Sequence, residues 1–309
     1  MSVAIAGGFG GLGRAIVEAV LAQGKHGVVI LTRKARENPF PAARVEVVDY
    51  SNVNGLTSVL EKNAVHTVIS VVNNITGDNS SEVNLINAAK MSKATKRFIP
   101  SYFGARYSPE QYESFPPAMA KKEAQAHLVS SGLEWTTVYN GYFLDYFGTP
   151  KVKSYVDDIG LFIDMAANAA VIPGSGKILV VFTHTFDVAK FVAAALDLPK
   201  WTEESYIIGD KLTWEEMVKV AQEVKGVKFH VTYDSVEKLQ SGKTTELPCH
   251  RKFYHLYPRE QLQFISSAFG LNCERGQANF APEHTLNEEF PGIKAKTVRE
   301  VMTEGWGTQ

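Results

Sequence analysis

Cysteine is nearly absent from this sequence, and neither charge is in excess. Only Cys249 and Cys273 occur among 309 residues, so a disulfide framework is excluded, whether these two thiols pair or stay free. The 32 Lys and Arg residues are balanced by 33 Asp and Glu residues. Without a basic surplus, we expect no nucleic-acid partner and no binding to an anionic membrane surface.

Long apolar runs are missing too. No apolar stretch reaches the roughly 18 residues that a membrane-spanning helix needs. The N-terminus has no basic segment before its apolar residues, so no secretory signal is predicted. We therefore expect a cytoplasmic globular protein without a membrane partner, as a monomer or a homodimer. The length of 309 residues suits one large domain or two unequal ones.

Several catalytic signatures are absent as well. The chain has no G-x-S-x-G elbow and no G-x-x-x-x-G-K-[ST] loop, which argues against a hydrolase and a nucleoside triphosphatase. Cys249 and His250 lack a second pair of ligands, so no metal site is predicted. No tyrosine is followed by a lysine four residues later, so the proton-donating pair of ordinary short-chain dehydrogenases is missing.

What the chain does contain is a glycine-rich turn at its beginning. Residues 3–6 predict a buried strand and residues 14–22 a helix, with glycines at 7, 10 and 13 between them. Gly7 permits a tight turn, Gly10 lets the backbone approach phosphates, and Gly13 lets the helix pack closely on the strand. The spacing G-x-x-G-x-x-G is associated with atypical and extended short-chain dehydrogenases, and the alternative is a turn that binds nothing. The predicted pyrophosphate contacts are Gly7, Gly8, Phe9, Gly10, Gly11, Leu12 and Gly13.

Strand-like and helix-like segments alternate through the first half of the chain. Short apolar segments predict strands at residues 28–31, 45–48, 67–72, 98–99 and 136–139. Helical patterns lie between them at residues 54–62, 82–93 and 121–131. This order predicts an α/β fold, a Rossmann-type doubly wound parallel sheet whose strands end at one common edge.

The pattern changes after about residue 150. Clear helical periodicity returns at residues 214–224 and 258–269, and a crossover can return to the sheet at residues 206–208. We expect residues 1–150 to form an NADP-binding domain and residues 151–309 a smaller C-terminal substrate-binding region, partly interleaved with the sheet.

The choice of NADP rests on the end of the second predicted strand. Enzymes that prefer NAD usually place a carboxylate there to bind the ribose hydroxyls. This chain has Arg33 and Lys34 instead, which suit a 2′-phosphate, although a solvated basic loop is the alternative. Asn73 follows the fourth predicted strand, where it can approach the cofactor or form an Asx turn.

Three segments resemble the isoflavone reductase-like proteins. This group includes the phenylcoumaran benzylic ether reductases and the NmrA-like proteins. Residues 98–104 are similar to its R-F-x-P-S-E-F-G segment, residues 121–136 to its K-x-x-x-R-x-x-x-x-x-x-G-I-x-Y-T stretch, and residues 140–143 to its N-x-F segment. The chain departs from the pattern at Tyr102, where relatives usually carry Glu, and at residues 38–43, which lack a second basic cofactor contact.

The resemblance implies that Lys121 is the general acid or base. A lysine has an ordinary pKa of about 10.4, and burial beside an apolar substrate would lower it toward neutrality. The alternative is a solvated lysine in the first turn of its helix. The aromatic residues near the end of the sixth predicted strand form either a core cluster or the place where nicotinamide and substrate meet. Predicted cofactor contacts there are Tyr139, Asn140 and Phe143, and predicted substrate contacts are Tyr102, Tyr142 and Tyr146.

Together these features predict an NADPH-dependent oxidoreductase of a small apolar secondary metabolite, aromatic or alkaloid-like. Hydride would pass to an electron-poor carbon of an enone, an iminium ion or a quinone methide, and Lys121 would handle the proton. Two alternatives remain open at this point. One is a redox-mediated cyclase of natural-product biosynthesis, and the other is a non-catalytic NmrA-like regulator that senses the dinucleotide.

Overall fold

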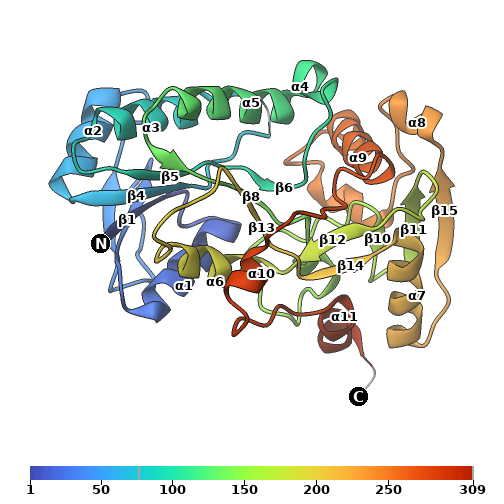
Figure 1. Ribbon diagram of the computed structural model, residues 1–309. Helices are drawn as coiled ribbons and strands as arrows, with labels where there is room; N and C mark the ends of the chain where they lie inside the picture. The colour runs from blue at the N-terminus through green and yellow to red at the C-terminus, as the bar shows by residue number, and fades with distance from the viewer. Residues whose placement is uncertain (76, 308–309) are drawn as a thin grey trace.

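The computed structural model describes residues 1–75 and 77–307, and its centre is a six-stranded parallel sheet (Figure 1). The strand order is that of a Rossmann-type doubly wound fold, which confirms the predicted fold class. In spatial order the strands are β3 (Arg44–Val47), β2 (Gly27–Thr32), β1 (Ser2–Ala6), β4 (Val65–Ser70), β5 (Arg97–Ile99) and β7 (Glu134–Trp135).

Helices cover both faces of this sheet. Because successive side chains of a strand point to opposite faces, Val3 and Ile5 pack in one apolar cluster while Ala4 and Ala6 pack in another. The first cluster includes residues of α1 (Gly11–Gln23) and α6 (Thr185–Ala195), and the second includes residues of α2 (Val53–Lys62), α3 (Ser80–Met91) and α5 (Pro116–Val129).

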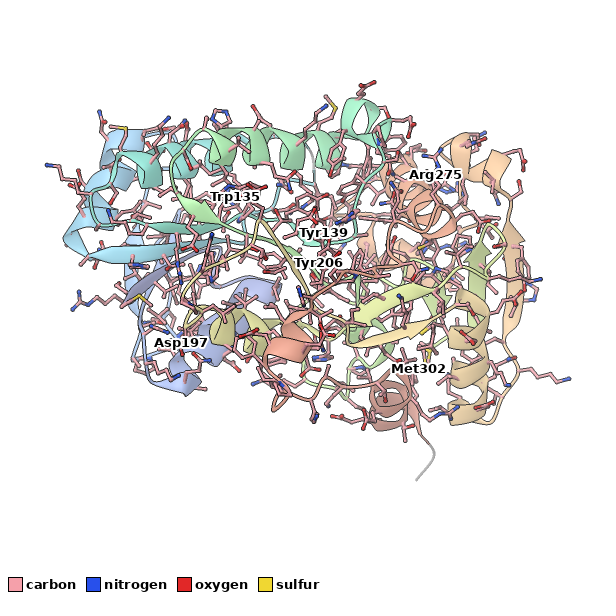
Figure 2. All side chains as sticks on the ribbon, viewed as in Figure 1. Trp135, Tyr139, Asp197, Tyr206, Arg275 and Met302 are labelled. Carbon is pink, nitrogen blue, oxygen red and sulfur yellow. The ribbon has the colours of Figure 1, made fainter. Side chains whose placement is uncertain are left out.

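The sixth predicted strand, residues 136–139, lies outside the large sheet. A separate short strand before it, β7, closes the large sheet, whereas β8 (Thr137–Tyr139) pairs in parallel with β6 (Phe103–Gly104) and with β13 (Glu204–Tyr206). The rings of Tyr139 and Tyr206 stack at this pairing, with centroids 5.1 Å apart (Figure 2). A strand from the second half of the chain therefore lies directly beside the first half.

The second half builds two further three-stranded sheets around its own core. One contains β9 (Tyr142–Phe143), β12 (Val180–Thr183) and β14 (Asp210–Leu212), and the other β10 (Ile163–Asp164), β11 (Ala169–Pro173) and β15 (His230–Asp234). Trp214 lies in the core between aromatic neighbours that include Phe162 and Phe182. The remaining helices are α4 (Gln111–Ser114), α7 (Trp214–Lys225), α8 (Val236–Gln240), α9 (Arg259–Glu274), α10 (Leu286–Glu289) and α11 (Val298–Trp306), with 3-10 turns η1 (Leu144–Phe147) and η2 (Pro248–Phe253).

The two cysteines are separate buried thiols, so the alternative of a disulfide between them is wrong. Over residues 1–75 and 77–307, no helix combines the length and the apolar character needed to cross a membrane. The same residues contain no group of three or more His, Cys, Asp or Glu side chains placed to hold a metal ion.

The close contact of α1 with the turn before it gives a first prediction. A Cβ atom added at Gly13 would lie 2.3 Å from the Gly7 carbonyl oxygen, which belongs to the backbone and cannot move aside easily. We expect Gly13→Ala to lower the free energy of unfolding by about 1–3 kcal/mol, measured by urea denaturation. Gly27→Ala is the matched control, because a Cβ there meets nothing within 4 Å. Equal stability of both variants would contradict the packing described here.

Candidate active site

Two cavities adjoin each other at the carboxyl edge of the large sheet. The first, which we call the glycine cavity, has a volume of about 300 Å³ and is lined by the turn after β1, by the end of β2 and by residues after β4. The second, the aromatic cavity, is also about 300 Å³ and is lined mainly by aromatic and aliphatic side chains. Val71, Val72 and Asn73 line both, so the two cavities share one wall.

The glycine turn forms an open backbone surface in the glycine cavity. Gly7 has a φ of +82°, and an added Cβ would lie 2.6 Å from the Val71 carbonyl oxygen. A Cβ at Gly10 would meet only the Gly7 carbonyl, at 3.5 Å, so this position stays accessible. The first turn of α1 contains no acidic residue, and its first amides have no acceptor within the helix. Such a helix start attracts a phosphate group.

The remaining residues of the predicted phosphate-binding turn have different surroundings. Phe9 lines the glycine cavity, whereas Leu12 lines the aromatic cavity. Gly8 faces the sheet, where a Cβ would lie 3.1 Å from side-chain atoms of Ile30 and Val17. Gly8 is therefore packed against its neighbours on this side, and its contact with the pyrophosphate stays a prediction.

Arg33 and Arg36 are the cations of the glycine cavity. Both line it, and the Arg36 guanidinium lies 5.2 Å from the centre of the Phe9 ring. Lys34 is exposed and does not line the cavity, and its backbone carbonyl accepts a hydrogen bond from the Thr32 hydroxyl at 3.1 Å. The predicted cofactor contact at Lys34 stays a prediction, and Arg36 joins Arg33 as a second candidate. Sequence reasoning missed Arg36, although it stands only three residues after Arg33.

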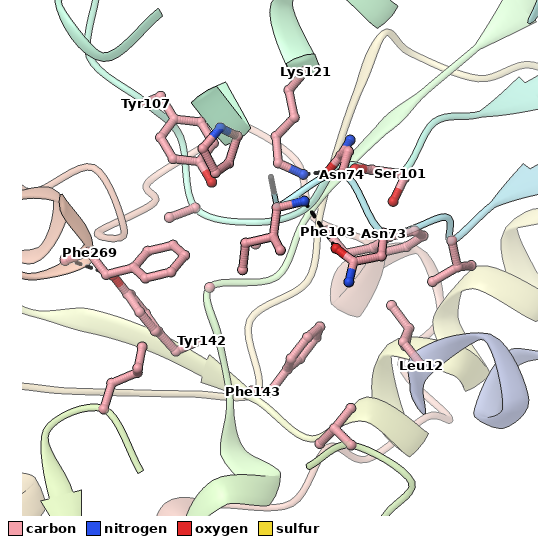
Figure 3. Close-up of a pocket in the computed structure, with 18 of the residues that line it drawn as sticks. Leu12, Asn73, Asn74, Ser101, Phe103, Tyr107, Lys121, Tyr142, Phe143 and Phe269 are labelled. Carbon is pink, nitrogen blue, oxygen red and sulfur yellow. Dashed lines mark hydrogen bonds between the residues drawn. The ribbon is translucent and has the colours of Figure 1, made fainter. Parts of the chain in front are cut away.

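Asn73 forms an Asx turn and also lines both cavities. Its side-chain oxygen accepts a hydrogen bond from the Ile75 amide at 3.0 Å, which makes it an Asx-turn residue. The same side chain lies on the wall shared by the two cavities (Figure 3). The Asx turn fixes the Asn73 side chain on this wall.

The aromatic cavity is enclosed by rings from segments far apart in the sequence (Figure 3). Phe143 and Tyr146 line it as the sequence predicted, and so does Tyr142, whose hydroxyl donates to the Phe269 carbonyl at 2.8 Å. Phe269 itself comes from α9 and was not predicted, because no local pattern brings α9 to this cavity. The other lining rings are Phe103 and Tyr107.

Lys121 is the only charged side chain among the described residues that line the aromatic cavity. It points into the cavity from α5, and its Nζ donates to the Ser101 carbonyl at 2.8 Å (Figure 3). Burial lowers the pKa of Lys121 to about 8, although the Glu82 carboxyl opposes this shift. The expected first-turn position is wrong: α5 begins at Pro116, with proline at its first positions, so Lys121 lies in the second turn.

Three predicted contacts lie behind the wall of the aromatic cavity rather than in it. Tyr102 is 1 % exposed, and its hydroxyl shares a hydrogen bond of 2.7 Å with the Tyr112 hydroxyl. Tyr139 belongs to the stack with Tyr206, and Asn140 is fully buried with its amide nitrogen on the Gly141 carbonyl. The Tyr102 ring has its centre 4.9 Å from the Lys121 Nζ atom. As cofactor and substrate contacts, the three residues stay predictions. Tyr139 and Asn140 lie behind the wall because the chain changes direction only after them.

Gly141 causes this change of direction. Its φ is +70°, and a Cβ there would lie 2.0 Å from the Val181 carbonyl oxygen. The turn separates the buried residues that precede it from Tyr142 and Phe143, which line the aromatic cavity.

A strap of residues 153–156 crosses the start of α1. Lys153 donates to Glu18 at 2.6 Å, the Tyr155 hydroxyl donates to the same carboxylate, and the Arg14 guanidinium lies 4.0 Å from the centre of the Tyr155 ring. Val156 lines the aromatic cavity and lies so close to Gly11 that an added Cβ would be 2.7 Å from its Cγ1 atom. Gly11 thus leaves room for the strap.

The chain is similar to known proteins over most of its length. The model of the NmrA-like family matches residues 1–270. Oxidoreductase BOA1 of Botryotinia fuckeliana is 36 % identical over 297 residues, covering 94 % of this chain and 95 % of that protein. Oxidoreductase swnN of Metarhizium robertsii is 29 % identical over 336 residues, covering 98 % and 97 %. The solved structure described as AtPrR2 with NADP+ and (+)pinoresinol has a TM-score of 0.75 at 22 % identity, covering 98 % of this chain and 97 % of that one.

The contact between the strap and α1 gives a second prediction. Gly11→Ala should lower the free energy of unfolding by about 1 kcal/mol, because the new methyl group would press on Val156. Val156→Ala removes the opposing atom, so the double variant should recover most of this loss. A thermal-denaturation cycle of the four proteins measures the coupling. Additive effects would show that the strap does not touch Gly11.

Proposed function

Because the chain belongs to the NmrA-like family, we propose that it is an NADPH-dependent oxidoreductase acting on a small apolar metabolite. The observation that carries this proposal is the position of Lys121, a single half-buried amine in an apolar cavity that shares a wall with a glycine-rich turn. Residues 1–150 would hold the dinucleotide, and residues 151–309 would complete the substrate side through the strap and Phe269. We extend the proposal to a cytoplasmic location and a monomer or homodimer.

The glycine cavity has the chemistry that NADP requires. The accessible backbone at Gly10 and the free amides of α1 suit the pyrophosphate. Arg33 and Arg36 suit a 2′-phosphate, since a guanidinium can donate two parallel hydrogen bonds to phosphate oxygens. Asn73 and the adjoining wall would guide the dinucleotide toward the aromatic cavity. NADPH bound there supplies a hydride from nicotinamide C4.

The role of Lys121 follows from its protonation state. With a pKa of about 8, the amine carries its proton in most molecules at neutral pH and can release it readily. It would donate this proton to the substrate oxygen, which gains negative charge through the conjugated double bonds when the electron-poor carbon accepts the hydride. Lys121 is then neutral and regains a proton from water before the next turnover.

The lining of the aromatic cavity ranks the three candidate acceptors. An enone and a quinone methide are neutral and present an oxygen that can take the Lys121 proton. An iminium ion carries a positive charge, and the described lining offers it an ammonium and no carboxylate. We therefore propose a neutral conjugated acceptor. A cavity of about 300 Å³ lies at the small end of ligand sites, which limits the substrate to a compact molecule.

The cyclase and regulator alternatives share the dinucleotide site and differ in what happens at Lys121. A regulator would bind NADPH but would reduce no enone. A cyclase would use the same proton and release a ring-closed product, which mass spectrometry separates from the simple reduction product.

Cofactor preference tests the two arginines. We expect Arg33→Ala and Arg36→Ala each to weaken NADPH binding by about 10- to 100-fold, because each removes a charged hydrogen-bond donor from the phosphate. NADH binding should change less than about twofold, since NADH lacks that phosphate. Calorimetric titration measures both, with Lys34→Ala as the matched control because Lys34 lies outside the glycine cavity. Equal losses for both dinucleotides would reject the phosphate contact.

Proton donation is tested at Lys121 itself. Lys121→Met should lower enone reduction by about 10²- to 10⁴-fold while NADPH affinity stays close to that of the wild type. The control is Lys122→Met, because Lys122 is exposed and does not line the aromatic cavity. Loss of NADPH absorbance with a panel of cyclic and aromatic enones measures the rate. Retained activity of Lys121→Met would remove the amine from the reaction.

The pH dependence has a definite direction. Reduction requires the protonated amine, so kcat/KM should fall as the pH rises through about 8. Oxidation of the product by NADP+ requires the neutral amine and should rise over the same interval. In Lys121→Met, neither the fall of the reduction rate nor the rise of the oxidation rate should be seen over this interval. A reduction rate that increases through this interval would be opposite to the proposed role.

A further inference from the structure

A buried carboxyl group lies behind the segment that Lys121 contacts. Glu82 stands in the first turn of α3, and the residue is 1 % exposed. Its Oε1 accepts the Ser101 amide at 2.5 Å, and its Oε2 accepts the Asn74 side-chain amide at 3.3 Å. Burial raises the pKa of the Glu82 carboxyl, because unpaired burial of a charge is costly, whereas the hydrogen bond from the Ser101 amide and the charge of Lys121 favour the carboxylate.

Ser101 is held from three directions. Glu82 binds its amide, Lys121 binds its carbonyl at 2.8 Å, and its hydroxyl donates to the Val72 carbonyl at 2.8 Å. Val72 lies on the wall shared by the glycine and aromatic cavities. Glu82 therefore fixes the residue that orients the Lys121 amine and, through it, the shared wall.

The other ionisable groups around Lys121 do not offer a buried negative charge. From the loop after β5 come Tyr102 and Tyr107, and burial raises the pKa of both phenols, so they stay neutral. On α5 itself, Lys122 and Glu123 are exposed to solvent, where water screens their charges. The group that counteracts the lowering of the Lys121 pKa by burial is the Glu82 carboxyl on α3.

We propose that Glu82 is a positioning residue for Lys121: it fixes the Ser101 segment that the amine contacts, and the attraction between its carboxylate form and the ammonium helps to keep the amine protonated. Without that charge, burial alone would act on Lys121 and leave too little ammonium at neutral pH to donate a proton. This inference rests on the proposed proton transfer by Lys121, so its tests measure the amine and the carboxyl directly, independently of turnover.

The first test is Glu82→Gln, which keeps the side-chain shape and an acceptor for the Ser101 amide but removes the charge. Competitive acetylation with acetic anhydride at a series of pH values, quantified at Lys121 by peptide mass spectrometry, gives the pKa of its amine. We expect Glu82→Gln to lower this pKa by about one pH unit, and the alkaline limb of enone reduction should move with it. Glu123→Gln, the same change on an exposed carboxylate of α5, should leave the pKa of Lys121 unchanged. An unchanged pKa in Glu82→Gln, or an equal fall in Glu123→Gln, would overturn the proposal.

The reciprocal test leaves Glu82 intact, so it remains informative if Glu82→Gln does not fold. Coupling between two ionisable groups acts equally on both. Lys121→Met should therefore raise the pKa of the Glu82 carboxyl by about one pH unit, followed by carbon NMR of protein labelled at glutamate carboxyls. No change would overturn the pairing. Retained turnover by Lys121→Met would instead reject the proton-donor role, so the two failures are distinguishable.

Discussion

The rest of the structure depends on one close approach of backbone to backbone. At Gly7 and Gly13 there is no room for a side chain, since the turn after β1 presses on Val71 and on the start of α1. This contact brings the amides of α1, the end of β4 and the loop that follows it to one edge of the sheet. The glycine and aromatic cavities share Val71, Val72 and Asn73 for that reason. The site is thus a consequence of how tightly the first helix packs on the first strand.

Much of this could be predicted from the sequence because the signals are local or periodic. The strand order follows from alternating apolar segments and right-handed crossovers, and Gly7 and Gly13 have the roles that their spacing predicts. Lys121 was found through the family resemblance rather than by periodicity, since the residues alone left a solvated lysine as an alternative. The start of α5 was missed because Pro116 and Pro117 interrupt the helical pattern while fitting the first turn well.

The site residues that the sequence did not indicate depend on contacts between distant segments or on the direction of the chain. Lys34 and Arg36 have the same charge, and the sequence alone does not distinguish Arg36, which lines the glycine cavity, from Lys34, which does not. Tyr102 belongs to a segment that resembles the family, and its ring packs in a core of tyrosines that the sequence pattern did not indicate. Phe269 reaches the aromatic cavity from α9, and nothing near it in the sequence indicates that position.

The proposed use of a lysine instead of a tyrosine as proton donor has a physical reason in this cavity. Burial disfavours whichever form of a group is charged. For a phenol the charged form is the deprotonated one, so burial raises the pKa of Tyr107 and makes it a weaker acid. For an amine the charged form is the protonated one, so the same apolar surroundings lower the pKa of Lys121 to about 8 and make it a stronger acid. A tyrosine becomes a stronger acid when a neighbouring cation lowers its pKa, and the described lining of the aromatic cavity offers no cation besides Lys121. This apolar cavity therefore favours an amine as the acid, provided that a carboxyl such as Glu82 helps to keep the amine charged.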